Sequence, residues 1–465
     1  MDSLDEKVLE DVSVVLTSGG MGTRNRPISL YSATSMIPKG LMRVTGIPLS
    51  ELQIEMLRAI GLTQFYIITR YLENRDQLSN RFGDGRKRFE VNISYSDPIE
   101  DILNNGPGDA ILRNIANHHI SGHSIVLAND NLYEANWREA VRLHKERGAV
   151  ITILATEMSP RETIGDYGLL DLDRASGRVR KITEKPRTEE ELLSALGLSD
   201  SVQLTDVVAQ ANTAGYILDN AALAAIAREA WVVTGRRKES GEFDMSRNLI
   251  KGLVERGYPV YARTIDNWAD LGSNPKYLRT VERALAGEFP SIGNVLKARG
   301  YKNPTSDTSV LVHERTYEQK YNGGKSLKEL MESGAVKIGP NVLIGSDVRI
   351  NEGAIIRYSS IEKDVNIGPN TDISHSVIFP YCIIGENARI ERSILGLQVH
   401  VDSSKDKPTI IEANSFLGPD TRVPRGYHLA GVTVYPAYEF GPNARTIADK
   451  ILKPSQESLL RALKM

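Results

Sequence analysis

SVVLTSGGMGTRNRP, residues 13–27, sets the architecture expected for the N-terminal half of this chain. The apolar run Val14 to Leu16 predicts a buried strand, and the glycines after it predict a tight loop that ends in Thr23 and Arg24. Glycine has no side chain to hold a phosphate away, and successive backbone N–H groups form an anion-binding concavity. The strand and its loop therefore indicate an α/β domain that binds a polyphosphate.

Strand and helix patterns alternate through the rest of this half, from about residue 12 to residue 285. SELQIEMLRAIG, residues 50–61, places Leu52 and Leu57 on one helical face, whereas QFYIITRY and HSIVLAND are typical of strands. Continuous Val, Ile and Leu runs indicate strands covered on both faces, and the alternation indicates a mostly parallel sheet. We expect a Rossmann-like domain over residues 1–285, with ligands beyond the carboxyl ends of its strands.

The sequence pattern changes in the C-terminal part. KARGYKNPTSDTS predicts a linker over residues 286–335. From Val336 onward, isoleucines recur at six-residue intervals with two five-residue steps, at Ile338, Ile344, Ile350, Ile356, Ile361, Ile367, Ile373, Ile378, Ile384 and Ile390. This period predicts a solenoid over residues 336–440 with the aliphatic residues stacked inside, and it resembles the left-handed parallel β-helix of hexapeptide-repeat proteins. The amphipathic tail, residues 441–465, predicts a helix.

Composition limits the class of protein. A chain of 465 residues is long for one core, so we expect two domains. An apolar share of 41% and a charged share of 25% are ordinary for a soluble globular protein, and a formal charge of −2 argues against a nucleic-acid partner. Cys382 is the single cysteine and has no partner for an intrachain disulfide. Without a signal peptide or a bilayer-length apolar run, we expect a cytoplasmic protein that has no membrane partner.

Two motifs together resemble the signature of the sugar-1-phosphate nucleotidyltransferases, also called NDP-sugar pyrophosphorylases. SGGMGTRNRP and IPKGLMRVTGIPLSE are similar to that family's GGxGTRLxPLT and PKPxxPVxGxP. The resemblance implies that Arg24 and Lys39 neutralise the β- and γ-phosphates of an NTP. It also implies that the loop presents backbone and hydroxyl groups to the triphosphate from Ser18, Gly19, Gly20, Met21, Gly22 and Thr23. The alternative is a plain strand–turn–helix with a surface arginine and lysine.

A pair of distant aspartates extends the resemblance. IVLANDNLY is similar to the family's VLxGDxL and NWADLGSNPKYL to its WxDIGTPxxY, which makes Asp130 and Asp270 the implied ligands of Mg²⁺. Magnesium takes oxygen ligands, usually one or two carboxylates plus substrate phosphates. Taken separately, Asp130 could cap a helix and Asp270 could be a turn residue.

Further segments resemble the sugar-binding half of such a site. DYGLLDLDRASGRVRKITEKP and ANTAGYIL are similar to the family's YGxxxxDxxGRVxxxxEKP and NAGIY segments. They imply that Glu184 accepts hydrogen bonds from sugar hydroxyls, that Lys185 and Asn212 contact the sugar or its phosphate, and that Gly168 lets the backbone approach the ring. The alternatives are a solvated Glu–Lys pair and a satisfied turn asparagine.

The base pocket has fewer signals. NNGPGDAIL resembles the family's GTAxA loop, which implies that Gly106 and Gly108 lie near the ribose or base. Asp97, in SYSDPIED, stands where thymidylyl- and uridylyltransferases carry glutamine. A carboxylate can accept from both N1–H and the 2-amino group of guanine, which favours GTP; the alternative is an Asp-Pro turn.

The implied reaction is attack by a sugar-1-phosphate on an NTP, giving an NDP-sugar and pyrophosphate. A nucleotidyltransferase domain before a β-helix resembles the ADP-glucose and mannose-1-phosphate enzymes, in which the helix mediates oligomerisation, so a homo-oligomer is expected. An ADP-glucose-type adenylyltransferase is one alternative. Another is a bifunctional enzyme whose β-helix is an acyltransferase, with His375 or His400 as base. A third is a non-catalytic regulatory homologue.

Two positions and one loop depart from the family pattern. Asn25 replaces a leucine, Asn129 replaces the glycine before Asp130, and ISLYSAT lengthens the loop between Pro27 and Thr34. These departures motivate the hypothesis of an unusual acceptor, a cyclitol phosphate in place of a sugar phosphate.

Overall fold

The chain forms two compact units in the computed structural model, which describes residues 7–462 apart from 21, 34, 98, 100–102, 199–203, 205–206, 306, 321–323 and 444. Unit 1 comprises Met1–Gly20 and Gln53–Trp268, and unit 2 comprises Met21–Leu52 and Ala269–Met465. The units do not divide at the predicted boundary, residue 285. The segment that carries Arg24 and Lys39 belongs to unit 2, together with the C-terminal repeats.

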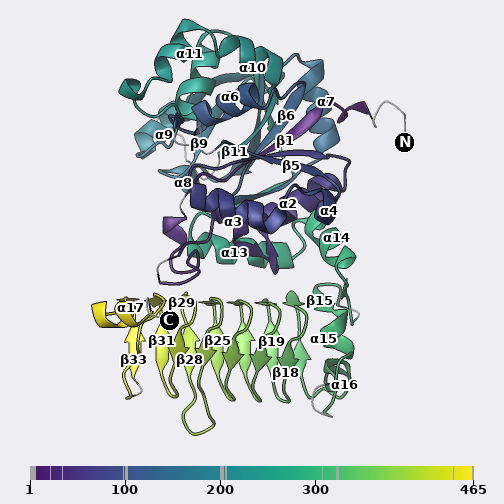
Figure 1. Cartoon of the computed structure of the whole chain (residues 1–465), viewed down its shortest axis with the longest axis vertical. Coiled ribbons are helices and arrows are strands. Elements are labelled where there is room, and N and C mark those ends of the chain that lie inside the picture. Colours follow the sequence, from purple (N-terminus) through teal and green to yellow (C-terminus); the bar gives the residue numbers. More distant parts are fainter. Residues whose placement is uncertain are drawn as a thin grey trace. The chain divides into compact units, whose positions relative to one another are not determined.

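Parallel strands form the centre of the unit 1 sheet (Figure 1). The first strand, β1 (Val12–Thr17), pairs in parallel with β4 (Gln64–Ile68) on one side and β6 (His123–Ala128) on the other, and β5 (Asn92–Tyr95) pairs with β4. Val14 and Leu16 are fully buried, as the continuous apolar run predicts. The predicted Rossmann-like α/β class is confirmed.

The other half of this sheet is mixed. The long strand β11 (Ala209–Asp219) pairs antiparallel with β6, with β8 (Ile151–Met158) and with β9 (Gly168–Leu172). Beyond β9 lies the edge strand β10 (Val179–Thr183), and β12 (Val260–Thr264) pairs in parallel with β8. A further short strand in unit 1 is β7 (Asn131–Glu134).

Helices connect these strands and cover the sheet (Figure 1). The unit 1 helices used below are α6 (Pro107–Asn117), α9 (Glu189–Leu196), the π-helix η5 (Met245–Ile250) and α12 (Lys251–Glu255). The others are α3 (Leu72–Phe82), α4 (Arg86–Phe89), α7 (Trp137–Glu146), α8 (Pro160–Thr163), α10 (Asn220–Ile226), α11 (Ala230–Gly235) and η4 (Lys238–Ser240). Helix α2 (Leu49–Arg58) begins in unit 2 and ends in unit 1.

The repeats of unit 2 form a parallel β-helix. In one sheet Ile344, Ile361 and Ile378 stack in register 17 residues apart, so two steps of six and one of five complete a coil. The other two sheets stack Ile350 on Ile367 and Ile356 on Ile373. All these isoleucines lie in one buried core, as the six-residue period predicts.

Short strands make up the three sheets. One contains β14 (Tyr301–Lys302), β15 (Val310–His313), β17 (Val342–Ile344), β20 (Ser360–Ile361), β23 (Val377–Ile378), β26 (Ile394–Leu395), β29 (Phe416–Leu417), β32 (Thr433–Val434) and β34 (Ile451–Leu452). The second contains β16 (Lys337–Ile338), β19 (Ile355–Arg357), β22 (Asp372–Ser374), β25 (Arg389–Glu391), β28 (Ile410–Glu412), β31 (His428–Ala430) and β33 (Thr446–Ala448). The third contains β18 (Arg349–Ile350), β21 (Asn366–Ile367), β24 (Ile383–Ile384), β27 (His400–Val401) and β30 (Arg422–Val423).

Both predicted ends of the repeat region differ from the structure. Strand β15 already pairs with β17, so the predicted linker 286–335 contains a β-helix strand besides α14 (Pro290–Ala298), α15 (Glu314–Glu318) and α16 (Leu327–Glu332). At the other end, β33 and β34 continue the stack, and the C-terminal helix α17 begins only at Gln456 and ends at Ala462. Inserted helices and turns hide the six-residue period at these two ends.

Residues 21–52 form small elements within unit 2. They are η1 (Thr23–Asn25), η2 (Lys39–Leu41) and the hairpin of β2 (Arg43–Val44) and β3 (Ile47–Pro48). The lengthened loop turns back on itself, because the Tyr31 N–H donates to the Ser35 carbonyl and the Ile37 N–H donates to the Ser29 carbonyl; Thr34 lies outside the described residues. The chain returns to unit 2 within β13 (Asn267–Asp270), and α13 (Asn274–Leu285) follows in that unit.

Candidate functional site

The first part of the glycine-rich loop follows β1 in unit 1. The Ser18 N–H donates to the Ile68 carbonyl at 2.7 Å, which holds the start of the loop against the end of β4. The Ser18 hydroxyl is buried and has no hydrogen-bond partner among the described residues. A Cβ on Gly19 would lie 3.4 Å from the Cβ of Arg70, so the backbone passes close to its neighbour here. Gly20 is exposed, and Met21 lies outside the described residues.

The second part of the loop belongs to unit 2 and brings Gly22 beside Lys39. Gly22 has a φ of +61°, and a Cβ on it would lie 3.5 Å from Lys39 Cγ and 3.4 Å from Ser29 Cβ. The Ser29 hydroxyl donates to the Gly22 carbonyl at 2.8 Å. A left-handed backbone and this crowding both favour glycine. Thr23 and Arg24, which follow, are exposed.

Arg24 and Asp270 meet in unit 2 around Gly272. A Cβ on Gly272 would lie 3.1 Å from Arg24 Nη2 and 2.8 Å from Asp270 Oδ1. The Asp270 side chain is only 13% exposed; Oδ1 accepts from the Gly272 N–H at 2.6 Å and Oδ2 is 2.8 Å from Lys276 Nζ. Two cations therefore lie around one carboxylate. The sequence motifs did not reveal Lys276, which lies in the first turn of α13, six residues beyond Asp270.

Asp130 lies in unit 1, half-buried in the turn between β6 and β7. It follows Asn129, which is buried and donates its backbone N–H to the Thr17 carbonyl at 3.0 Å. The two predicted magnesium ligands thus belong to different units. Within the described residues, no group of three or more His, Cys, Asp or Glu side chains is arranged to hold a metal ion. The shared ligation by Asp130 and Asp270 stays a prediction.

The predicted sugar-binding residues come together in unit 1. Gly168 begins β9, Asn212 lies on β11, and Glu184 follows β10. A Cβ on Gly168 would lie only 2.6 Å from Glu184 Oε2, so that glycine leaves room for the carboxylate. Asn212 Nδ2 donates to Ser246 Oγ at 2.9 Å, and Ser246 also hydrogen-bonds Glu184. Ser246, on η5, thus joins two residues that are 28 positions apart in the sequence.

Glu184 is electrostatically unusual within this cluster. Burial raises the pKa of its carboxyl group, and the nearby charge of Asp244 raises it further, while Lys185 and Arg247 oppose the shift. Its Oε2 atom is buried without a hydrogen-bond partner among the described residues. Lys185 is exposed, with a φ of +49° that turns the chain away after Glu184. A buried carboxylate oxygen without a donor is suited to a ligand hydroxyl.

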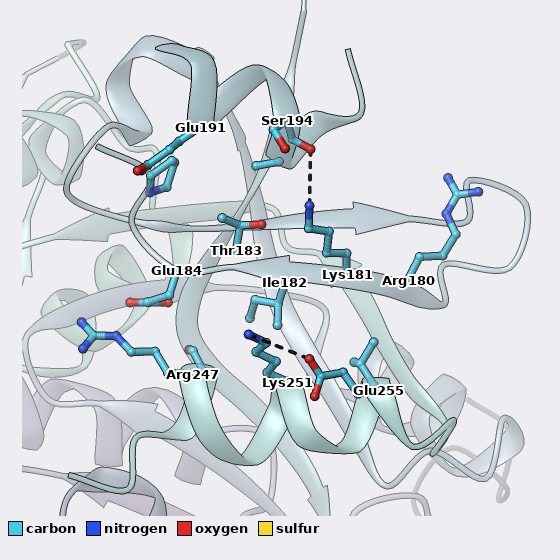
Figure 2. A pocket seen from close by; sticks show the side chains of 14 residues that line it. Arg180, Lys181, Ile182, Thr183, Glu184, Glu191, Ser194, Arg247, Lys251 and Glu255 are labelled. Atoms are coloured by element: carbon cyan, nitrogen blue, oxygen red, sulfur yellow. Dashed lines mark hydrogen bonds and ion pairs between the residues drawn. The ribbon is translucent and has the colours of Figure 1, made fainter. Parts of the chain in front are cut away.

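A pocket of about 670 Å³ adjoins Glu184 along the edge strand β10 (Figure 2). Helices α9 and α12 lie on either side of the strand, and the Glu184 carboxylate and Arg247 guanidinium approach one another at one end of the pocket (Figure 2). The other charged residues lining it are Arg180, Lys181, Glu191, Lys251 and Glu255. Lys251 pairs with Glu255 at 3.9 Å and Lys181 donates to the Ser194 carbonyl at 3.4 Å. The pocket is therefore polar and carries both signs of charge.

The predicted base-binding residues have other roles visible in the structure. Asp97 is exposed and its Oδ1 accepts the Ile99 N–H at 2.8 Å, the local turn named above as the alternative. Gly106 has a φ of +108°, and a Cβ on it would lie 2.9 Å from the Phe243 carbonyl oxygen; one on Gly108 would lie 3.0 Å from the same atom. Close packing against Phe243 thus explains both glycines without a ligand. Contact with a base stays a prediction for all three residues.

Asn25, which departs from the family pattern, and His375 and His400, the alternative acyltransferase bases, also have side-chain partners in the structure. Asn25 is buried and its Nδ2 donates to the Leu271 carbonyl at 2.7 Å, which ties η1 to the end of β13. His375 hydrogen-bonds Glu282 at 3.1 Å, and His400 lies 3.2 Å from Asp402. Among the described residues, no helix is both long and apolar enough to span a bilayer.

Comparison with known proteins matches two family models to successive parts of this chain. Residues 13–286 match the family described as nucleotidyl transferase, and residues 331–447 match the GMPPB C-terminal domain. The chain is 27% identical over 396 residues to a UTP–glucose-1-phosphate uridylyltransferase of Synechocystis sp., covering 82% of this chain and 90% of that protein. It is 24% identical to a probable mannose-1-phosphate guanyltransferase of Schizosaccharomyces pombe (88% and 92% covered). A glucose-1-phosphate adenylyltransferase of Koribacter versatilis is also 24% identical (90% and 94% covered).

Proposed function

Because the chain belongs to the nucleotidyl transferase family, we propose that it transfers a nucleoside monophosphate from an NTP to a sugar-1-phosphate. A phosphate oxygen of the acceptor forms a bond to the α-phosphorus, the bond between the α-phosphorus and the bridging oxygen breaks, and pyrophosphate leaves with the electron pair. The attacking phosphate is already an anion at neutral pH, so the step needs no general base. Orientation and charge neutralisation supply the catalysis.

One observation carries the proposal: the cluster of Glu184, Ser246 and Asn212 beside Gly168. Its buried carboxylate oxygen, Glu184 Oε2, has no donor among the described residues, and Gly168 leaves the room that this oxygen occupies, since a Cβ there would lie only 2.6 Å from it. Sugar hydroxyls are donors of the kind such an oxygen accepts. Lys185 supplies a cation at the end of the same segment, suited to the acceptor phosphate.

The phosphate-handling residues are Arg24 and Lys39. Lys39 lies beside Gly22 and Arg24 lies beside Gly272, so both side chains lie against glycines of the same unit. Cations held near a polyphosphate stabilise the charge that develops on departing pyrophosphate. Ser18, Gly19, Gly20, Met21 and Thr23 are the proposed backbone and hydroxyl donors.

Mg²⁺ is the proposed metal, with Asp130 and Asp270 as its protein ligands. The donor chemistry fits: Asp270 offers a carboxylate, held in place by the Gly272 N–H and the Lys276 ammonium group, and Mg²⁺ takes carboxylate oxygens as ligands. When bound, the ion would neutralise phosphate charge. Lys276 orients the Asp270 side chain through its contact with Oδ2.

We propose GTP as the nucleotide and a hexose-1-phosphate or cyclitol phosphate as the acceptor. The Asp97 carboxylate supports guanine, and so does the match of residues 331–447 to the GMPPB C-terminal domain. Relatives named for UTP and for adenylyl transfer define the competing outcomes. Assembly through the β-helix and a cytoplasmic location are part of the same proposal.

A matrix of four NTPs against glucose-, mannose- and inositol-type phosphates, read by pyrophosphate release, tests this proposal. The expected result is release that depends on both substrates and on Mg²⁺, fastest with GTP. Preference for UTP or ATP would overturn the assignment of the base and leave the reaction intact. Preference for glucose- or mannose-1-phosphate over every cyclitol phosphate would contradict the hypothesis that the acceptor is a cyclitol phosphate.

A further inference from the structure

A buried ion pair joins the Lys39 segment to the β-helix within unit 2. Arg43 lies on β2, and Glu362 follows β20 of the β-helix. Arg43 Nε donates to Glu362 Oε2, and Arg43 Nη2 donates to the Gly46 carbonyl. The side chains are 23% and 1% exposed. Glutamate is almost never fully buried unless it is paired, and here Arg43 is the partner of Glu362. The contact therefore links the segment that contains Lys39 to a repeat of the β-helix more than 300 residues away.

The same arginine contacts α13. The Tyr277 hydroxyl donates to the Arg43 carbonyl, and the fully buried Tyr277 ring packs edge-on against Phe379 of the β-helix, with ring centroids 6.3 Å apart. Tyr277 lies in the first turn of α13, which begins at Asn274, and it directly follows Lys276, the partner of Asp270. Arg43 thus joins the hairpin to the helix that carries the partner of Asp270.

Lys39 lies four residues before Arg43 in the chain, and backbone hydrogen bonds hold Met42, the residue next to Arg43. The Met42 N–H donates to the Lys39 carbonyl at 3.0 Å, and the Leu49 N–H donates to the Met42 carbonyl at 2.8 Å. These bonds restrain the backbone between Lys39 and Arg43. A shift of Arg43 would therefore move Lys39, which packs against Gly22 of the phosphate loop.

The pair is poorly suited to stabilising the fold. Burial raises the pKa of Glu362, against the attraction of Arg43, and Glu362 Oε1 is buried without a hydrogen-bond partner among the described residues. Replacement of a buried ion pair by apolar residues of similar volume is often neutral or stabilising. A contact that is expensive to bury and incompletely satisfied points to a role in geometry.

We propose that Glu362 is a positioning residue for nucleotidyl transfer: through Arg43 it fixes the β2–β3 hairpin and Lys39, so the β-helix is part of the catalytic apparatus. This inference rests on the proposed function, in which Lys39 neutralises the departing phosphates. Misplacement of a charge that acts in the transition state lowers kcat more than it raises KM.

Steady-state kinetics of Glu362→Gln in the full chain test this inference, with Glu391→Gln as the matched control on an exposed β-helix position. In the part of the chain that the structure describes, Glu391 pairs with Arg389, and their side chains are 36% and 57% exposed. We expect kcat of Glu362→Gln to fall on the order of 10- to 100-fold with a small change in KM for the NTP. The control should match the wild type. An unchanged kcat for Glu362→Gln overturns the inference.

The double variant Arg43→Met/Glu362→Met separates positioning from stability. It should keep or raise the melting temperature and still show the loss of kcat; recovery of wild-type kcat overturns the inference. Hydrogen exchange gives a readout that does not depend on activity. Amides of residues 38–48 should exchange faster in Glu362→Gln than in the wild type, and equal exchange there also overturns the inference. If the wild type releases no pyrophosphate with any substrate pair, the proposed function fails by itself.

Discussion

Asp270 illustrates how single residues in this site are held by their neighbours. Its two oxygens accept from the Gly272 N–H and the Lys276 ammonium group, and Arg24 lies against the same glycine. The sequence analysis identified Asp270 and Arg24 because both stand in short segments that resemble motifs of the nucleotidyltransferase family. It could not identify Lys276, since nothing in the local pattern says that a helix turns this lysine back onto the aspartate.

Asp270→Asn should lower kcat on the order of 100-fold, because the amide loses the charge that would bind Mg²⁺ and that Lys276 now pairs with. Pyrophosphate release at several Mg²⁺ concentrations measures the effect. Asp266→Asn, at an exposed position four residues earlier, is the control and should behave as the wild type. Wild-type kcat in Asp270→Asn would remove Asp270 from the proposed metal site.

Glu184→Gln should raise KM for the acceptor and stabilise the fold relative to the wild type as the pH rises. The pKa of Glu184 is higher in the folded state than in the unfolded state. Glu184 therefore stabilises the fold fully at a pH below its unfolded pKa, near 4.5, and this stabilisation is lost as the pH rises through its folded pKa. The neutral variant avoids this loss, so its melting temperature should gain on the wild type as pH rises above about 4.5, while KM for the acceptor increases. Thermal unfolding from pH 4 to 8 measures the difference.

Glu190→Gln is the matched control for that experiment, since Glu190 is exposed on α9 near the same pocket. Its melting temperature should track the wild type across the pH range. A difference between Glu184→Gln and the wild type that is constant with pH would contradict the assigned burial of Glu184.

At the scale of elements, regular periods were predictable and irregular contacts were not. The isoleucine period predicted that aliphatic residues stack inside a solenoid, and the structure shows this stacking in three sheets, because each coil repeats the same inward positions. The antiparallel strand β11 and the strand β15 inside the predicted linker lacked such a signal. Ser246 was missed because its role depends on η5 packing against β11, a long-range contact that leaves no local pattern.

Gly106 and Gly108 show that glycines required for close packing between two elements can resemble a ligand-binding loop in the sequence. Gly106→Ala should destabilise the chain by about 1–3 kcal/mol, because its Cβ would collide with Glu242 and the Phe243 backbone at a φ of +108°. Gly293→Ala, inside α14 with nothing within 4 Å of the new Cβ, should be neutral or stabilising by up to about 1 kcal/mol. Denaturant unfolding compares them, and equal effects would contradict the packing account.

For the whole molecule, the main feature is the membership of residues 21–52 in the β-helix unit. The outward-facing strand residues Val377 and Ile394 of the β-helix are 2% and 0% exposed, although they lie outside its inner core. Tyr277 packs on Phe379, and a Cβ on Gly418 would lie 2.9 Å from Pro27 Cβ. A second apolar face therefore packs within unit 2. Neither the period nor the motifs predict it, because it joins residues hundreds of positions apart.

A fragment ending at residue 289 should accordingly be inactive and should lose cooperative unfolding, because residues 21–52 and α13 lose their apolar partner. Circular dichroism melting and pyrophosphate release measure both properties. Co-expression of residues 290–465 is the control and should restore activity by supplying the missing half of unit 2. A fragment 1–289 as active as the full chain would contradict the unit assignment.

The most direct test of the central claim is ³¹P NMR of the full chain with Mg²⁺, an NTP and a sugar- or cyclitol phosphate. The account predicts that the NTP and acceptor signals fall together while pyrophosphate and the two coupled phosphorus signals of a nucleoside diphosphate ester grow in equal amounts. Release of inorganic phosphate or of a nucleoside monophosphate, or unchanged spectra with folded protein for every substrate pair, would contradict it.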